Sequence, residues 1–172
     1  MADERDLKTG EKIYLDLISH NKPSYRCSNN WILIEDSDTK QKWYFFTNSK
    51  GDSTENVASF LKKMKTMKKT VKIIRCDNAG ENKTLEDNCA NFFEEIKFEY
   101  TSPVTPQQNG MVKPYSRMCA LMMHTELHKN LKTGIWPECA ATAIKLKNIM
   151  VNPYKEKCAH EKFYGKIPDY AK

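Results

Sequence analysis

Long apolar stretches are absent from this sequence. No run approaches the roughly 20 consecutive apolar residues that a membrane-spanning helix requires. The chain opens with Met1, Ala2 and then four charged side chains, which do not resemble a secretory signal. We therefore expect an intracellular protein, in the nucleus or the cytoplasm, that has no membrane partner.

Closely spaced cysteines are also lacking. The six cysteines are scattered, and no two of them form a Cys-x-x-Cys pair. This scatter is typical of reduced thiols and argues against a disulfide framework or a structural zinc site. His124 and His128 have a spacing that could chelate a metal, but no third ligand accompanies them, so an exposed helix face is the better interpretation.

What the chain does contain is enough material for one folded domain. Its 172 residues are 40% hydrophobic and 10% aromatic, which argues against disorder. The net charge of +6 favours polyanionic partners, but only mildly. The lysine-rich segment 62–69 could be a nuclear-import signal or a DNA-facing patch, although a solvated helix face is the favoured interpretation.

The order of the hydrophobic patterns predicts a mixed α/β sheet. Three β-prone runs separated by turn signals indicate an antiparallel meander, and the continuous aromatic run of the third is typical of a strand buried on both faces. Helix and strand patterns then alternate, and helical patterns close the chain. The predicted strands are 13–17, 31–34, 43–46, 71–75 and 97–101; the predicted helices are 52–69, 84–93, one around 115–122 and one around 136–144.

This order of elements implies a five-stranded mixed sheet flanked by helices, which is the order of the ribonuclease H-like fold. Residues 1–10 are expected to be an N-terminal extension, and residues 11–151 the domain itself. Residues 152–172 are expected to be an irregular tail. No internal repeat and no second domain are indicated.

Two aspartates stand out by their positions on the predicted strands. Asp16 lies on the first strand, and Asp77 comes just after the fourth. In the ribonuclease H-like order these strands are neighbours, so the two carboxylates would converge. Paired carboxylates suit Mg²⁺ or Mn²⁺, and such ions support phosphodiester chemistry. Taken singly, however, either aspartate is more simply an ordinary residue at the end of a strand.

Three segments, in the right order, resemble motifs of the integrase catalytic core of copia-type retrotransposons. Residues 74–81 (IRCDNAGE) resemble the signature RSDNGGE, and residues 105–110 match the loop TPQQNG without a change. Residues 163–169 (FYGKIPD) are similar to the tail WYGKKPD. The resemblance extends from about residue 11 to the C-terminus.

The resemblance implies a catalytic triad of two aspartates and one glutamate, of which this chain matches only two. Asp16 and Asp77 take the aspartate positions and would be the metal ligands. The glutamate commonly follows the second aspartate with 35 residues between, and that position holds Lys113. An ammonium about 4 Å from a cation costs roughly 4 kcal/mol per unit charge at an effective dielectric of about 20. Lys113 would instead lie between the aspartates as an internal counter-ion, and binding of Mg²⁺ or Mn²⁺ is expected to be weak or absent.

Pro114 is a second departure, because the corresponding segment of the family is helical. A proline beyond the first turn of a helix costs about 3 kcal/mol. The helix therefore begins later in this chain or is kinked, and either change would shift position 113.

The resemblance also implies DNA as a partner and self-association into a homodimer. The residues expected to contact DNA lie after the fourth strand, in the TPQQNG loop and one turn into the next helix. They are Asn78, Gln107, Gln108, Asn109, Lys113 and Arg117.

We therefore expect an integrase core-like domain, without the zinc module and the C-terminal extension of the family, whose catalysis is impaired at Lys113. Two alternatives stay open. One is an active metal-dependent polynucleotidyl transferase or endonuclease that uses a substitute acid. The other is a domesticated protein-interaction module without DNA activity.

Overall fold

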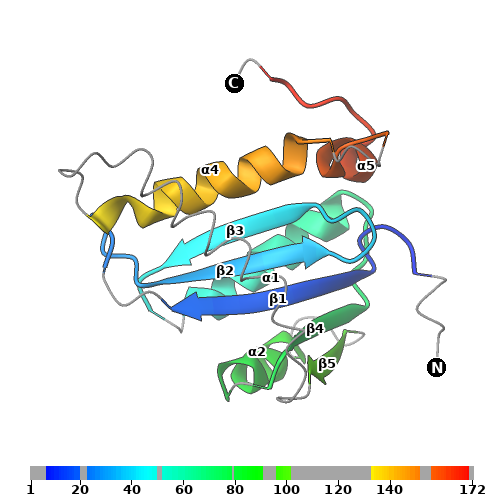
Figure 1. Cartoon of the computed structure of the whole chain (residues 1–172). Coiled ribbons are helices and arrows are strands. Elements are labelled where there is room, and N and C mark those ends of the chain that lie inside the picture. Colours follow the sequence, from blue (N-terminus) through cyan, green and yellow to red (C-terminus); the bar gives the residue numbers. More distant parts are fainter. Residues whose placement is uncertain are drawn as a thin grey trace.

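A five-stranded mixed sheet forms the centre of the protein (Figure 1). The computed structural model describes residues 7–19, 23–49, 52–78, 80–90, 96–101, 133–151 and 156–170. The strands lie in the order β3-β2-β1-β4-β5. Their bounds are β1 (Lys12–Ser19), β2 (Asn30–Asp36), β3 (Lys42–Thr47), β4 (Ile73–Asp77) and β5 (Lys97–Thr101).

The pairing of the strands confirms the predicted sheet. Strands β1, β2 and β3 form an antiparallel meander, whereas β1 pairs with β4, and β4 with β5, in parallel. Parallel pairing requires a crossover, and α1 and α2 supply one each, before and after β4. The predicted α/β class and five-stranded mixed sheet with flanking helices are therefore confirmed.

Helices cover both faces of the sheet. Helix α1 passes behind the sheet in Figure 1, α4 runs along the opposite face, and α2 lies beside β4 and β5. None of the helices in the described residues has the length and apolar content needed to span a membrane. The helices are α1 (Asp52–Thr66), α2 (Gly80–Ala90), the short 3₁₀ helix η3 (Thr133–Ile135), α4 (Trp136–Ile149) and α5 (Ala159–Tyr164).

Strand β2 separates two hydrophobic cores. All seven of its residues are buried, because successive side chains point to opposite faces and each face is covered. Ile32 and Ile34 pack into the core that α1 shares. Trp31 and Leu33 pack into the second core, beneath α4.

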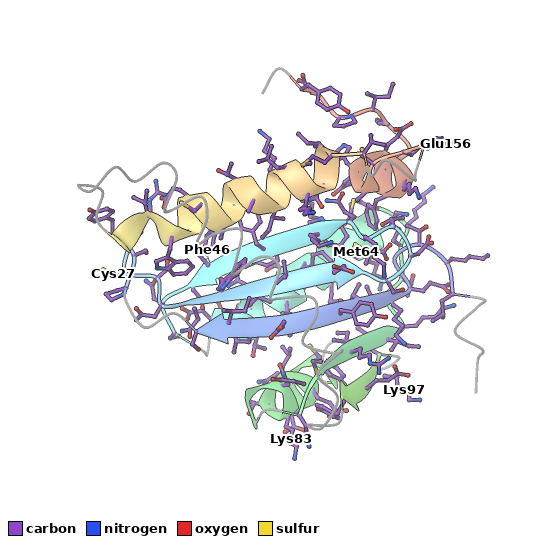
Figure 2. All side chains as sticks on the ribbon, viewed as in Figure 1. Cys27, Phe46, Met64, Lys83, Lys97 and Glu156 are labelled. Atoms are coloured by element: carbon purple, nitrogen blue, oxygen red, sulfur yellow. The ribbon has the colours of Figure 1, made fainter. Side chains whose placement is uncertain are left out.

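Strand β3 corrects one prediction from the sequence. The aromatic run 43–46 was expected to be buried on both faces, but β3 is an edge strand and its four aromatic residues are only partly buried or exposed. Their rings instead attach helices to the edge of the sheet. Phe46, which is labelled in Figure 2, meets Trp136 of α4 edge-on at 5.5 Å between ring centroids. The ring of Trp43 lies 5.0 Å from that of Phe60 of α1. The strand that is buried on both faces is β2.

The C-terminal tail is the second correction, because part of it is helical and packed. Within residues 152–172, which were expected to be irregular, α5 carries Phe163 into the first core. The hydroxyl of Tyr164 accepts a hydrogen bond from Nε1 of Trp43 at 3.2 Å. Gly165 ends the helix in the left-handed conformation, with φ of 66°, which glycine adopts without strain. The segment that resembles the WYGKKPD motif is thus a helix end that packs against the sheet.

Candidate active site

Asp16 and Asp77 lie on adjacent strands near the same end of the sheet. In the parallel pairing of β1 with β4, Tyr14 lies opposite Arg75. Asp16 lies two residues after Tyr14, and Asp77 lies two residues after Arg75. Because side chains alternate between the two faces of a sheet, the two aspartates lie next to each other on the same face. Asp77 is the last residue of β4, not the first residue beyond it. The topology therefore brings together two carboxylates that are 61 positions apart in the chain.

The environment of Asp16 disfavours its charged form. Burial, and after it the negative charge of Asp77, together raise the pKa of Asp16 from 3.8 to about 6. A hydrogen bond from the Leu17 backbone opposes this shift. Two carboxylates whose charges repel in a partly buried place are typical of a site for a cation, which would relieve both the burial cost and the repulsion.

Asn82, on the first turns of α2, holds Asp77 in place and was missed from the sequence. Its side chain is 2% exposed. The Asn82 amide donates one hydrogen bond to the backbone carbonyl of Asp77 at 3.1 Å and another to its carboxylate Oδ1. The prediction began the helix at residue 84, whereas α2 begins at Gly80. The earlier start places the amide within reach of the carboxylate, and only the spacing of five residues could have suggested it.

The thiol of Cys76, the residue before Asp77 on β4, is a poor nucleophile at neutral pH. Cys76 is 2% exposed, and its burial raises the pKa of the thiol to about 12, helped by the charges of Asp77, Glu86 and Asp16. A thiol with so high a pKa carries almost no thiolate at neutral pH. Glu86 accepts a hydrogen bond from the hydroxyl of Tyr100. Burial, together with that hydrogen bond, raises the pKa of Tyr100.

A third metal ligand is not found in the described part of the chain. Among those residues, no group of three His, Cys, Asp or Glu side chains could hold a metal ion. Among the described residues, Glu86 does not form such a group with Asp16 and Asp77. In the described part of the chain, the site therefore consists of the carboxylates of Asp16 and Asp77, the second of which accepts a hydrogen bond from the Asn82 amide.

Of the residues expected to contact DNA, the structure describes one. Asn78 directly follows Asp77 and is exposed, so its side chain is accessible beside the carboxylates. The others lie outside the described residues, as does the position of the family's glutamate. These are Gln107, Gln108, Asn109, Lys113 and Arg117.

Comparison with known sequences shows similarity to a transposon polyprotein. No protein-family model matches the chain. The chain is 26% identical over 153 residues to the retrovirus-related Pol polyprotein from transposon TNT 1-94 of Nicotiana tabacum. That alignment covers 86% of this chain but only 11% of the polyprotein.

Comparison with solved structures gives the fold. A chain of the simian T-cell lymphotropic virus intasome in complex with PP2A regulatory subunit B56 gamma has a TM-score of 0.66 at 11% identity, covering 93% of this chain and 58% of that one. The catalytic core domain of BIV integrase has a TM-score of 0.61 at 12% identity, covering 91% and 95%. The predicted resemblance to a retroelement Pol polyprotein is therefore confirmed in sequence, and the predicted fold of an integrase catalytic core is confirmed by the solved structures. The copia-type assignment stays a prediction.

Proposed function

Because this chain has the fold of an integrase catalytic core and resembles a transposon Pol polyprotein in sequence, we propose that it is a copia-type integrase core-like domain. In this proposal it binds DNA and its catalysis is impaired. The observation that carries the proposal is the pair Asp16 and Asp77, adjacent in the sheet, with the pKa of Asp16 raised to about 6. A nuclear or cytoplasmic location belongs to the same proposal, and fluorescence microscopy of the tagged chain tests it.

The donor chemistry of the pair suits Mg²⁺ or Mn²⁺. Both side chains offer carboxylate oxygens, the ligands that hard divalent cations prefer. When bound, such an ion supplies Lewis-acid activation for attack on a phosphodiester by water or a 3′-hydroxyl. Asp16 and Asp77 would hold it, and Asn82 would keep the Asp77 carboxylate oriented.

Two departures from the family's sequence support impairment. Lys113 occupies the position of the family's glutamate, and Pro114 stands beside it. A protonated lysine offers no lone pair to a cation and repels it.

Titration calorimetry with Mn²⁺ tests this interpretation directly. We expect no micromolar binding to the wild type and at least about tenfold tighter binding to Lys113→Glu, which replaces repulsion with attraction. Asp77→Asn in the Lys113→Glu background is the matched control and should abolish the gain. Micromolar binding by the wild type that disappears in Asp77→Asn would contradict the proposal. Mn²⁺-dependent nicking or strand transfer with the same sensitivity would favour the active enzyme with a substitute acid.

DNA binding is tested by its dependence on salt. Contacts with phosphate weaken steeply between about 50 mM and 200 mM salt, because bound counterions are released. We expect fluorescence anisotropy to show binding of a duplex at low salt that weakens over this range. Loss of affinity in Arg117→Ala, but not in the exposed Lys83→Ala on α2, would support the predicted surface. A chain that fails to bind at low salt is better explained as an interaction module. Analytical ultracentrifugation reports whether the chain forms the expected homodimer.

A further inference from the structure

The positive charge of the chain is concentrated in one segment. Seven of its 28 basic side chains lie between Glu55 and Asp77, and no acid lies among them. The rest of the chain has 21 basic and 22 acidic side chains, so this segment accounts for the whole net charge of +6. It comprises the last turns of α1, the connection to β4 and most of β4 itself.

The fold brings a lysine of another strand to the same end of the sheet. After α1, the N–H of Lys69 donates to the carbonyl of Met64 at 3.0 Å, and the chain then enters β4. The N–H of Lys97, at the beginning of β5, donates to the carbonyl of Lys72 at 2.8 Å (Figure 2 labels Lys97). The lysines that gather where α1 ends and where β4 and β5 begin are called the basic end. They are Lys62, Lys65, Lys68, Lys69, Lys72 and Lys97.

Acids neutralise little of the basic end. Glu11 pairs with Lys72 at 2.6 Å, and Glu99, on β5, is paired with the buried Lys12 at 3.1 Å. Within the described stretches of the chain, the other lysines of the basic end take part in no ion pair. Most of their charge is therefore available to a partner.

A solvated helix face accounts for only part of this arrangement. The dipole of a helix favours cations in its last turn, which covers Lys65. Lys69, Lys72 and Lys97 lie outside α1 and gain nothing from that dipole. Surfaces that serve solubility alone usually mix both signs of charge. An array of one sign that a helix, a connection and a strand build together indicates a polyanionic partner.

The chemistry of the basic end fits the phosphates of a duplex. A lysine ammonium meets phosphate as a point charge and lacks the fork with which arginine reads base edges, so binding would not depend on base sequence. In the described part of the chain, none of the large hydrophobic or aromatic side chains that are exposed belongs to α1, β4 or β5. The surface therefore has nothing to insert into a membrane, and nothing on which the bases of a single strand would stack.

We propose that the basic end binds the phosphate backbone of a nucleic-acid duplex without regard to base sequence. Lys72 directly precedes β4 and Asp77 ends it, which places the two about 16 Å apart along the strand. This surface is separate from the one expected beside the aspartates, and it uses neither Asp16 nor the loop 105–110. A chain with both surfaces would hold two nucleic-acid segments at opposite ends of one sheet.

Lysine acetylation of the full chain locates the contact. The chain is acetylated alone and with a duplex of random sequence at about 50 mM salt, and mass spectrometry reports which lysines the duplex protects. We expect protection of Lys62, Lys65 and Lys97, and none of the exposed Lys147 and Lys157. Vesicles of phosphatidylcholine and phosphatidylserine are the second probe. Protection by the vesicles but not by the duplex would overturn the assignment to nucleic acid, and protection by neither would overturn the surface.

A variant with three neutralised lysines measures how much the basic end contributes. Lys62→Gln, Lys65→Gln and Lys97→Gln change exposed side chains, so the combined variant should retain the fold. In fluorescence anisotropy it should bind the duplex at least about tenfold more weakly, and the slope of log K against log salt should become shallower by about 3.

The matched control has the same net charge but retains the basic end. It combines Lys83→Gln, Lys147→Gln and Lys157→Gln, all at exposed positions, and should keep the affinity and the slope of the wild type. Equal losses in the two combined variants would overturn the proposal, because they would show a response to net charge alone. Arg117→Ala separates this surface from the proposed function. A loss of binding in Arg117→Ala without a loss in the basic-end variant would overturn the basic end and leave the proposed function standing, whereas the reverse result would support the basic end alone.

Discussion

The side-chain amide of Asn82 hydrogen-bonds to two oxygens of Asp77, the backbone carbonyl at 3.1 Å and the carboxylate Oδ1. The pair lies where β4 ends and α2 begins, so it connects the end of a sheet strand to the helix that follows. One buried amide thereby holds both the course of the backbone and the orientation of a candidate catalytic carboxylate.

Asn82→Asp is the sharpest test of this contact, because it changes the donor to a carboxylate with almost no change in shape. At pH 7 we expect a loss of about 3 kcal/mol in the free energy of unfolding, since the Asn82 donor would be replaced by a second carboxylate that faces the carbonyl and the carboxylate of Asp77. Much of the loss should be recovered near pH 4, where a carboxylic acid can donate. Chemical denaturation at both pH values measures it. The control is Asn56→Asp, whose amide makes an exposed bond to the Asp52 carbonyl; a similar loss there would show that the Asn82 contact is not special.

The raised pKa of Asp16 predicts a pH-dependent stability. Burial, and then the charge of Asp77, raise the pKa from 3.8 to about 6, so the folded state binds a proton more tightly than the unfolded chain does. The stabilisation is therefore fully present below pH 3.8 and is lost as the pH rises through about 6. Asp16→Asn removes the titrating group. We expect it to be more stable than the wild type by about 2 kcal/mol at pH 7.5, with little difference near pH 4. A difference that does not vary with pH would contradict the assignment.

Phe163 should contribute strongly to stability, although it belongs to a motif near the end of the chain. It is 3% exposed, its ring lies 4.8 Å from that of Trp43, and the ammonium of Lys69 lies 4.4 Å from its centroid. Phe163→Ala should cost about 3–5 kcal/mol, the usual range for a buried phenylalanine. Ile167→Ala, four residues on and 75% exposed, should cost less than about 0.5 kcal/mol. Thermal unfolding of both variants is the measurement, and equal melting temperatures would show that α5 does not pack as described.

Asn148 attaches α4 to the edge of the sheet. Its amide oxygen accepts from the backbone N–H of Lys42, and its amide nitrogen donates to the Lys42 carbonyl, both at 2.9 Å. Asn148→Ala removes the side-chain acceptor of the Lys42 N–H and one donor to the Lys42 carbonyl, which still accepts from Nε2 of Gln41 at 3.1 Å. We therefore expect a loss of about 1–2 kcal/mol in the free energy of unfolding. Hydrogen exchange should locate the loss, with faster exchange at the Lys42 amide and unchanged exchange in the centre of β1. Unchanged protection at Lys42 would contradict the attachment.

Much of the fold could be predicted because strands and helices leave different periods in the sequence. The runs 13–17, 31–34 and 97–101 fall within β1, β2 and β5, and the helical spacing of Phe60, Leu61 and Met64 matches the buried face of α1. The aromatic run of β3 was misjudged. Hydrophobicity alone does not distinguish a strand covered on both faces from an edge strand whose rings hold helices in place.

The sequence identified some residues of the candidate site and missed others. The positions of Asp16 and Asp77 on the predicted strands identified the two aspartates, and the motif around Asp77 supported the second. Counting from Asp77 identified position 113, because spacing along the chain is a local feature. Asn82 could not be predicted, since its role depends on the exact residue at which α2 begins, and helix ends are the least certain part of any sequence pattern.

By itself, then, the sequence determined the order of elements, the resemblance to integrase cores and the identity of Asp16, Asp77 and Lys113. Only the tertiary structure decided that β2, not β3, lies between two cores. It also decided that Phe163 packs on Trp43 from 120 positions away, and that the Asn82 amide reaches the carboxylate of Asp77. The physical reason is that the spacing of apolar residues indicates which face of a helix or strand is buried. Which residues pack against that face depends on segments that are far apart in the chain.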